Sequence, residues 1–290
     1  MMMMSIATIK STRQQIREAD LLSPVPDSGW CSLPEICRLL DITTDDKSSD
    51  IQFQRRRVKA GQWVFGCGER FDAMFIVFSG FLKTLQVDEV GNEQILGFPM
   101  KGDLLGIDGL HDGHYASQAV ALTDCELIVI PIREMAGLGA ENNLLENWLY
   151  RAMSRELVRG HAVMGLLGTL GAEARVARFL VSLSERFAAI GYSPNSFNLR
   201  MTRQEIGSYL GLTLETVSRS FSALNDAGLI NINQRAVEIK DITTLRSLQR
   251  LAATPKTVAK VCKTKRIELA RTTTDSLKHS MWAELTLAAA

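Results

Sequence analysis

Three side chains that can form hydrogen bonds with DNA base edges stand close together in the C-terminal half of the chain. They are Glu215, Ser218 and Arg219, with Thr216 between them. An arginine suits the O6 and N7 atoms of guanine, a glutamate accepts from the cytosine amino group, and a serine can pair with several base edges. Exposed at the start of a helix, such a group is a candidate for reading sequence in the major groove.

The residues around this group predict the two helices that would position it. Thr202 followed three residues later by Glu205 is a capping box, which begins a first helix. Gly211 ends that helix because glycine tolerates a left-handed backbone, and Thr213 caps a second helix. Each helix has an apolar face, formed by Ile206, Tyr209 and Leu210 in the first and by Val217, Phe221 and Leu224 in the second. Two helices joined by a short glycine-containing turn are a helix-turn-helix.

A further polar group, Thr202, Arg203 and Gln204, stands at the predicted start of the first helix. Backbone N–H groups at a helix N-terminus, together with an arginine, can hold a DNA phosphate. The pattern alone is equally compatible with a plain helical hairpin whose polar positions face water, so that alternative stays open on the residue types.

The hydrophobic pattern divides the chain into segments of different type. Short apolar runs separated by glycine-containing turns predict an antiparallel β domain over 51–139. Apolar residues three, four and seven apart predict a long helix over 140–170, and the helix-turn-helix lies within 171–248. We expect 1–50 to be irregular apart from a short helix over 34–40, and 249–290 to be a basic, disordered tail. The predicted fold class is α+β.

Composition and charge exclude several classes of protein. The 290 residues are 46% hydrophobic and 22% charged, which suits about two globular domains. Lys and Arg number 33 against 32 acidic residues, so the net charge is too small to attract the whole chain to a membrane or to DNA. No apolar stretch reaches the roughly 20 residues that span a bilayer, and five scattered cysteines do not form a disulfide framework. We expect a cytoplasmic protein that contacts no membrane and, without a phosphate loop or a nucleophile group, is no enzyme.

Two segments, TRQEIGSYLGLTLETVSR and LNDAGLI, resemble the winged helix of the Crp/Fnr family, which includes the cyclic-AMP receptor and the fumarate-nitrate-reduction regulators. GDLLGIDGL resembles the glycine-rich turn of that family's sensor domain. The resemblance covers about 28–250. It implies an N-terminal antiparallel β-roll of the cyclic-nucleotide-binding kind, a long dimerisation helix and a C-terminal winged helix-turn-helix. It also implies a transcription regulator that binds double-stranded DNA as a homodimer.

The run from Glu215 to Arg219 resembles the fumarate-nitrate-reduction branch in particular, which implies a target like TTGAT-N4-ATCAA.

The resemblance also implies protein partners. The loop 87–97 is similar to one that touches RNA polymerase in activators of the family, so the polymerase is an expected partner. On the long helix, we expect a dimer seam. The alternative is that the apolar residues of this helix pack onto the chain's own β domain. The expected seam residues are Trp148, Leu149, Met153, Leu157 and Met164.

The positions that hold cyclic AMP in the family carry other residues in this chain. Ile107 stands where the family has a carboxylate, and Tyr115 and Ala116 stand where it has an Arg–Ser pair. Without the arginine, a buried phosphate would keep an unpaired charge, which is costly. We therefore expect no cyclic-AMP binding.

The fumarate-nitrate-reduction branch holds a four-iron cluster on four cysteines, and this chain matches that set only in part. Cys31 and Cys37 resemble two of the ligands, whereas Ser28 and Ile128 stand at the other two positions. A cluster normally needs four thiolates, so the iron–sulfur ligand set is incomplete and we assign no cofactor. The alternative function is a regulator that senses redox state or a gas through its N-terminal domain. The sensing group would be a thiol pair formed by Cys31 and Cys37, a haem or an iron–sulfur cluster.

Overall fold

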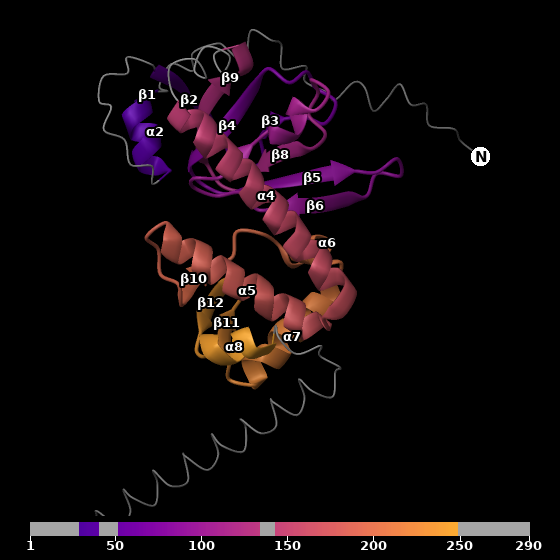
Figure 1. Ribbon diagram of the computed structural model, residues 1–290. Helices are drawn as coiled ribbons and strands as arrows, with labels where there is room; N and C mark the ends of the chain where they lie inside the picture. Colours follow the sequence, from indigo (N-terminus) through magenta and orange to yellow (C-terminus); the bar gives the residue numbers. More distant parts are fainter. Residues whose placement is uncertain (1–28, 41–51, 134–142, 249–290) are drawn as a thin grey trace, which may run out of the picture.

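The computed structural model describes residues 29–40, 52–133 and 143–248, without the side chains of 143–148, 162–164 and 166–169. The expected tail at 249–290 and most of the expected irregular segment lie outside these ranges. Figure 1 shows an upper β domain, a lower helical domain and one long helix that runs between them.

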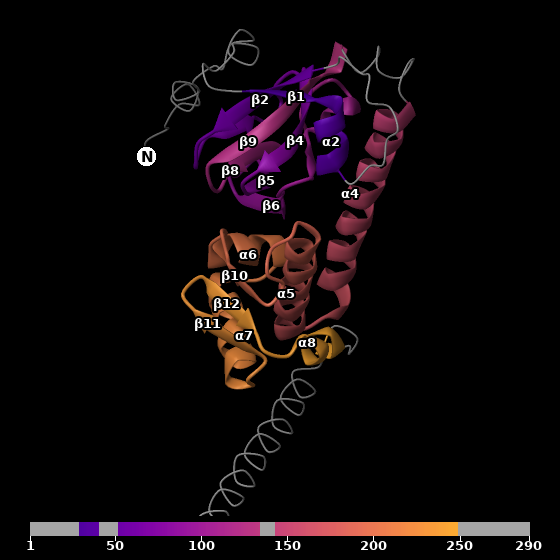
Figure 2. The same ribbon diagram turned by 90° about the vertical axis from the view of Figure 1, so that its left-hand side faces the viewer.

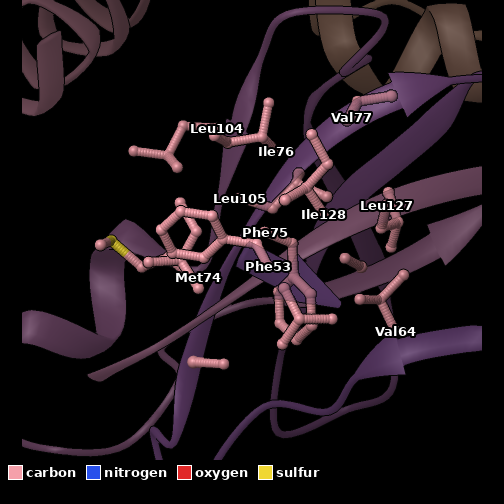
Figure 3. Close-up of a cluster of buried hydrophobic side chains, with 14 of the residues drawn as sticks. Phe53, Val64, Met74, Phe75, Ile76, Val77, Leu104, Leu105, Leu127 and Ile128 are labelled. Carbon is pink, nitrogen blue, oxygen red and sulfur yellow. The ribbon is translucent and has the colours of Figure 1, made fainter. Parts of the chain in front are cut away.

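The β domain is built from two antiparallel sheets. One has the order β1-β2-β9-β4-β7 and the other the order β3-β8-β5-β6. Between them lies an apolar core that includes Phe53, Phe75 and Ile128, each at most 1% exposed (Figure 3). The strands are β1 (Trp30–Ser32), β2 (Gln52–Val58), β3 (Trp63–Phe65), β4 (Ala73–Ser79), β5 (Leu82–Val87), β6 (Glu93–Gly97), β7 (Leu104–Leu105), β8 (Gln118–Ala121) and β9 (Cys125–Pro131).

The N-terminal strand β1 and helix α2 (Leu33–Leu39) pack on this domain. Cys31 of β1 pairs with Phe53 of β2, and α2 buries Leu33, Ile36 and Cys37 in the core of the roll. The structure therefore differs from the predicted irregular segment 1–50, because the apolar residues of 31–37 need a surface to cover them. The helix expected at 34–40 is present as α2, one residue earlier.

Helix α4 (Asn143–Thr169) crosses from the β domain to the helical domain, as Figure 2 shows. Leu149 and Ala152 are buried against the core of the β-roll, and Met153 packs beside them. On another face of the helix, Tyr150 and Leu157 are 57% and 63% exposed. They are seven residues apart, which places them on one side of the helix. Helix α4 thus has one face on its own domain and a second, exposed apolar face.

The C-terminal domain surrounds a small three-stranded sheet with helices. Helix α5 (Ala172–Ala189) packs on α7 and α8, and the sheet has the order β10-β12-β11. The elements are β10 (Ser196–Asn198), α6 (Arg203–Leu210), α7 (Leu214–Asp226), β11 (Ile230–Asn233), β12 (Ala236–Ile239) and α8 (Ile242–Leu248). The hairpin of β11 and β12 is the wing.

The two domains share apolar and polar contacts. Phe98, from the end of β6, packs edge-on against Tyr209 of α6, with ring centroids 5.3 Å apart. Lys83 of β5 forms a 2.8 Å ion pair with Glu205 of α6. The hydroxyl of Ser208 donates to the carbonyl of Glu93 at 2.8 Å and accepts from the N–H of Ile95 at 2.9 Å. The first helix of the predicted helix-turn-helix therefore lies directly against the β5–β6 hairpin (Figure 2).

Candidate nucleic-acid interface

Local capping and one tight turn set the geometry of the helix pair. The Thr202 hydroxyl accepts from the Glu205 N–H at 3.2 Å, and the Glu205 carboxylate accepts from the Thr202 N–H at 2.7 Å. Gly211 has a φ of 62°, which favours glycine because a side chain is strained there. Gly207 is equally required, since a Cβ atom on it would lie 2.6 Å from the Leu212 carbonyl oxygen. The two glycines let α6 and α7 approach each other closely.

Helix α7 buries one face and presents the other to solvent. Val217, Phe221 and Leu224 are at most 2% exposed. Glu215 and Arg219 are exposed in the first two turns, and Ser218 and Thr216 are half-buried beside them. The Thr213 hydroxyl accepts from the Thr216 N–H at 3.2 Å, which caps the helix. The structure therefore brings the predicted base-reading residues together at the N-terminal end of one exposed helix face.

The electrostatics of this face suit hydrogen bonding to bases. A backbone N–H group and the Thr213 hydroxyl lower the pKa of Glu215, so its carboxylate is ionised and can accept from a cytosine amino group. Arg219 reaches the Thr216 hydroxyl at 3.5 Å, a weak contact that leaves its guanidinium available. An acceptor and a five-donor group thus stand side by side on the helix.

The structure places Arg203 differently from the expectation of a free phosphate ligand. Its guanidinium stacks on the ring of Phe221, 3.5 Å from the centroid, and donates to the carbonyl of Gln234 in the wing turn at 3.2 Å. The Nη1 atom is buried with no hydrogen-bond partner, and burial lowers the pKa of the group. Arg203 joins α6 to the wing and to α7, the candidate recognition helix, which favours a positioning role. Sequence reasoning missed this contact because it joins residues far apart in the chain.

Thr202 and Gln204 remain exposed at the start of α6. They lie beside the N-terminal backbone groups of the helix, where a phosphate could bind. Of the three residues predicted for phosphate contact, these two keep the accessibility that the role needs.

The residues inside the β-roll do not fit a cyclic nucleotide. The ring of Tyr115 stacks on Phe65, with centroids 4.0 Å apart, and its hydroxyl donates to the carbonyl of Ala73 at 2.6 Å. A Cβ atom on Gly106, in the glycine-rich turn, would lie 2.9 Å from the Tyr115 ring. The aromatic side chain therefore fills the space beside the turn and supplies no cation for a phosphate.

The described cysteines do not fit a four-iron cluster. Cys31 pairs with Phe53 on β2, whereas Cys125 pairs with Val58 of the same strand. Five residues of strand separate these two positions by about 16 Å. Ser28 lies outside the described residues, and a buried isoleucine occupies position 128. In the described ranges, no three His, Cys, Asp or Glu side chains are grouped so that they could hold a metal ion.

Cys31 and Cys37 are buried, at 0% and 3% exposure. Burial raises the pKa of both thiols, although the neighbouring Arg55 partly opposes the shift at Cys31. The thiolate is the reactive form, so both positions disfavour fast thiol chemistry at neutral pH. Their role as a redox pair stays a prediction.

No helix in the described part of the chain is both long enough and apolar enough to cross a membrane.

Comparison with known proteins identifies both domains. The model of the Crp-like helix-turn-helix domain matches residues 174–248, and that of the cyclic nucleotide-binding domain matches 55–142. The transcriptional regulatory protein btr of Bordetella pertussis is 40% identical over 228 residues, which cover 77% of this chain and 94% of btr. The fumarate and nitrate reduction regulatory protein of Escherichia coli K12 is 33% identical over 75% of this chain and 88% of that protein.

The solved structure of FixK2 from Bradyrhizobium japonicum has the same architecture, with a TM-score of 0.63 at 27% identity. It covers 69% of this chain and 99% of the FixK2 chain. The predicted fold class, an antiparallel β-roll followed by a helix-turn-helix domain, is confirmed. Both relatives are named as regulatory proteins, and family models match both domains, so this chain belongs to the Crp/Fnr family of transcription regulators.

Proposed function

We propose that this protein is a sequence-specific regulator that binds a TTGAT-N4-ATCAA-like palindrome as a homodimer. The observation that carries the proposal is the exposed start of α7, where Glu215, Ser218 and Arg219 stand on a helix whose opposite face is buried. Their types supply an acceptor, a two-way hydroxyl and a bidentate donor for base edges. Thr216 lies beside them, and Thr202 and Gln204 complete the surface with contacts to the DNA backbone.

Helix α4 supports the homodimer. Leu149 packs on the β-roll of its own chain, which is the alternative to a dimer seam. Leu157 does not pack there and is exposed. Tyr150, Leu157 and Val158 are between 57% and 64% exposed, and large apolar side chains so close together are typical of a protein interface. The side chains of Trp148 and Met164, also expected in the seam, lie outside the described residues. A two-fold dimer would place one α7 helix in each half-site, about one DNA turn apart.

We further propose that the protein activates transcription by contact with RNA polymerase. The relative from Pseudomonas aeruginosa, 39% identical over 75% of this chain, is named transcriptional activator protein anr. In this chain the tip of the β5–β6 hairpin projects from the roll (Figure 1), and Val90 on it is 87% exposed. An exposed apolar residue that follows two acidic ones, Asp88 and Glu89, is suited to a protein partner.

The test is binding of the purified protein to a labelled TTGAT-N4-ATCAA duplex and to a scrambled duplex at physiological salt. Arg219→Ala should weaken binding to the palindrome by about 5- to 150-fold, which corresponds to about 1–3 kcal/mol per bidentate contact. Binding to the scrambled duplex should change much less. Arg70→Ala is the matched control, because Arg70 is an exposed arginine of the β-roll.

An equal loss on both duplexes would show that Arg219 contacts phosphate only. If the wild-type protein binds the scrambled duplex as tightly as the palindrome, the proposed target sequence is contradicted.

A further inference from the structure

A cavity of about 440 Å³ opens at the boundary between the two domains, outside the β-roll. Its walls come from five separate parts of the chain: helix α2, Arg55 of β2, the end of β4 with the turn to β5, Lys101, and the loop after α5. This volume lies within the range of small-molecule sites, roughly 300–1,000 Å³. The position differs from the interior of the roll, where Tyr115 fills the space beside the glycine-rich turn.

Positive charge dominates the lining of the cavity. Arg38, Arg55 and Lys101 line it, against one carboxylate, that of Glu35. Arg38 and Lys101 form no ion pair with any residue in the described ranges. Glu35 is engaged in the cap of α2, because its carboxylate accepts from the Ser32 N–H at 2.8 Å. The cavity therefore has an excess of cationic groups over acceptors.

Arg55 is the cation of the cavity whose contacts with the rest of the fold are best defined. Its side chain is 18% exposed and its guanidinium stacks on Phe78, 4.0 Å from the ring centroid. Its ion pairs with Glu35 and Glu126 are long, at 3.8 and 3.9 Å. Its Nε atom is buried without a hydrogen-bond partner. Arg55 lines the cavity with only these long ion pairs to its guanidinium, so an anion bound there could form a closer charged contact with it.

The remaining walls are apolar and aromatic. Phe81 of the β4–β5 turn and Ile190 and Tyr192 of the loop after α5 line the cavity. Phe81 also contacts Phe187 of α5, with ring centroids 5.8 Å apart. A ligand in this place would touch the β-roll on one side and the DNA-binding domain on the other.

We propose that this cavity binds a small anion that carries a phosphate or carboxylate group on an apolar or aromatic body. The anionic group lies among Arg38, Arg55 and Lys101, and the body lies against Phe81 and Tyr192. Because the walls belong to both domains, occupancy favours the domain arrangement in which the cavity has this shape. The site is separate from the DNA-reading surface, so it is tested independently of DNA binding.

The probes are phenyl phosphate and phenylacetate, with benzyl alcohol as the neutral counterpart, and the measurement is isothermal titration calorimetry on the full-length protein. We expect saturable binding of at least one anion and none of benzyl alcohol. Which anion binds more tightly distinguishes a phosphate ligand from a carboxylate ligand.

Arg38→Ala/Lys101→Ala should weaken that binding at least tenfold. Lys59→Ala/Arg70→Ala is the matched control, because it removes two exposed positive charges from the β-roll outside the cavity. Ser79→Glu, at an exposed position of the cavity lining, should abolish binding by adding a negative charge. Circular dichroism verifies that each variant is folded.

Two results would overturn the proposal. One is the absence of saturable binding of either anion to the wild-type protein. The other is equal weakening by the cavity and control variants, which would show that the anion follows net charge and not the cavity.

Discussion

Replacement of Arg203 by alanine distinguishes two roles for this residue: positioning α7 and the wing, or binding a DNA phosphate. In the structure the guanidinium stacks on Phe221 at 3.5 Å and donates to the Gln234 carbonyl at 3.2 Å. A partly desolvated cation–π contact contributes up to about 2 kcal/mol, and a hydrogen bond from a charged group about 1.5–3 kcal/mol. Alanine also removes the buried, unpartnered Nη1 atom, which offsets part of the loss. We therefore expect a net destabilisation of about 1–3 kcal/mol.

This loss is measured as the melting temperature of the full-length protein, which falls by about 2–4 °C per kcal/mol in a protein of this size. Gln204→Ala is the control for the melting temperature alone, because Gln204 is exposed in the same helical turn. Specific DNA binding should weaken in Arg203→Ala as well, since the arginine ties the recognition helix to the wing. A phosphate ligand would behave differently: its loss weakens binding to all sequences alike and reduces the salt slope by about 1.

The positioning role is refuted if Arg203→Ala keeps the wild-type melting temperature and lowers affinity equally for palindromic and scrambled duplexes. In that case the arginine leaves Phe221 when DNA is present and binds a phosphate, as the residue types alone suggest.

Three further changes test the dimer, the recognition-helix cap and the link between domains. Leu157→Glu should convert a dimer to a monomer in sedimentation analysis, because it places a charge on the exposed apolar face of α4; an unchanged mass would contradict this seam. Thr213→Ala should cost about 1 kcal/mol of stability, the usual value of an N-cap, seen as a lower melting temperature. Burial raises the pKa of Glu205, but Lys83 and the Thr202 N–H more than offset it, so the pKa lies below its usual value. The stability from Glu205 is thus present above its unfolded-state pKa and lost as pH falls through the lower folded-state pKa. The melting temperature should therefore decline more between pH 7 and pH 3 in the wild type than in Glu205→Gln, and parallel curves would refute the argument.

The helix-turn-helix could be predicted from sequence because its signals are local. The Thr202–Glu205 capping box, Gly211 and Thr213 act on residues within four positions, and the structure has each of them in the expected role. The sheet order could not be predicted in the same way, because a run of apolar residues does not identify its partner strand. Cys31 illustrates this: only its pairing with Phe53 shows that β1 belongs to the roll.

The placement of Arg203 and the boundary cavity depend on contacts between distant segments. Arg203 meets Phe221 and Gln234 across about 18 and 31 positions, and no local pattern indicates such a meeting. The cavity is similar, since α2, the β4–β5 turn and the loop after α5 meet only in the folded chain. Residue types alone therefore predict a free arginine at the start of the first helix and say nothing of a cavity between the domains.

The contacts between the domains give the β-roll a physical means to influence the DNA-reading surface. Asp103 is 8% exposed in a turn of the roll and forms ion pairs with Arg159 of α4 at 2.9 Å and with Arg186 of α5. The Glu205 carboxylate, which caps α6, is at the same time the ion-pair partner of Lys83 in the roll. Lys83 thus connects the roll to the cap of α6, and Asp103 connects it to α4 and α5. Because α7 packs on both α5 and α6, these ion pairs form part of a contiguous path from the roll to the helix that carries Glu215, Ser218 and Arg219.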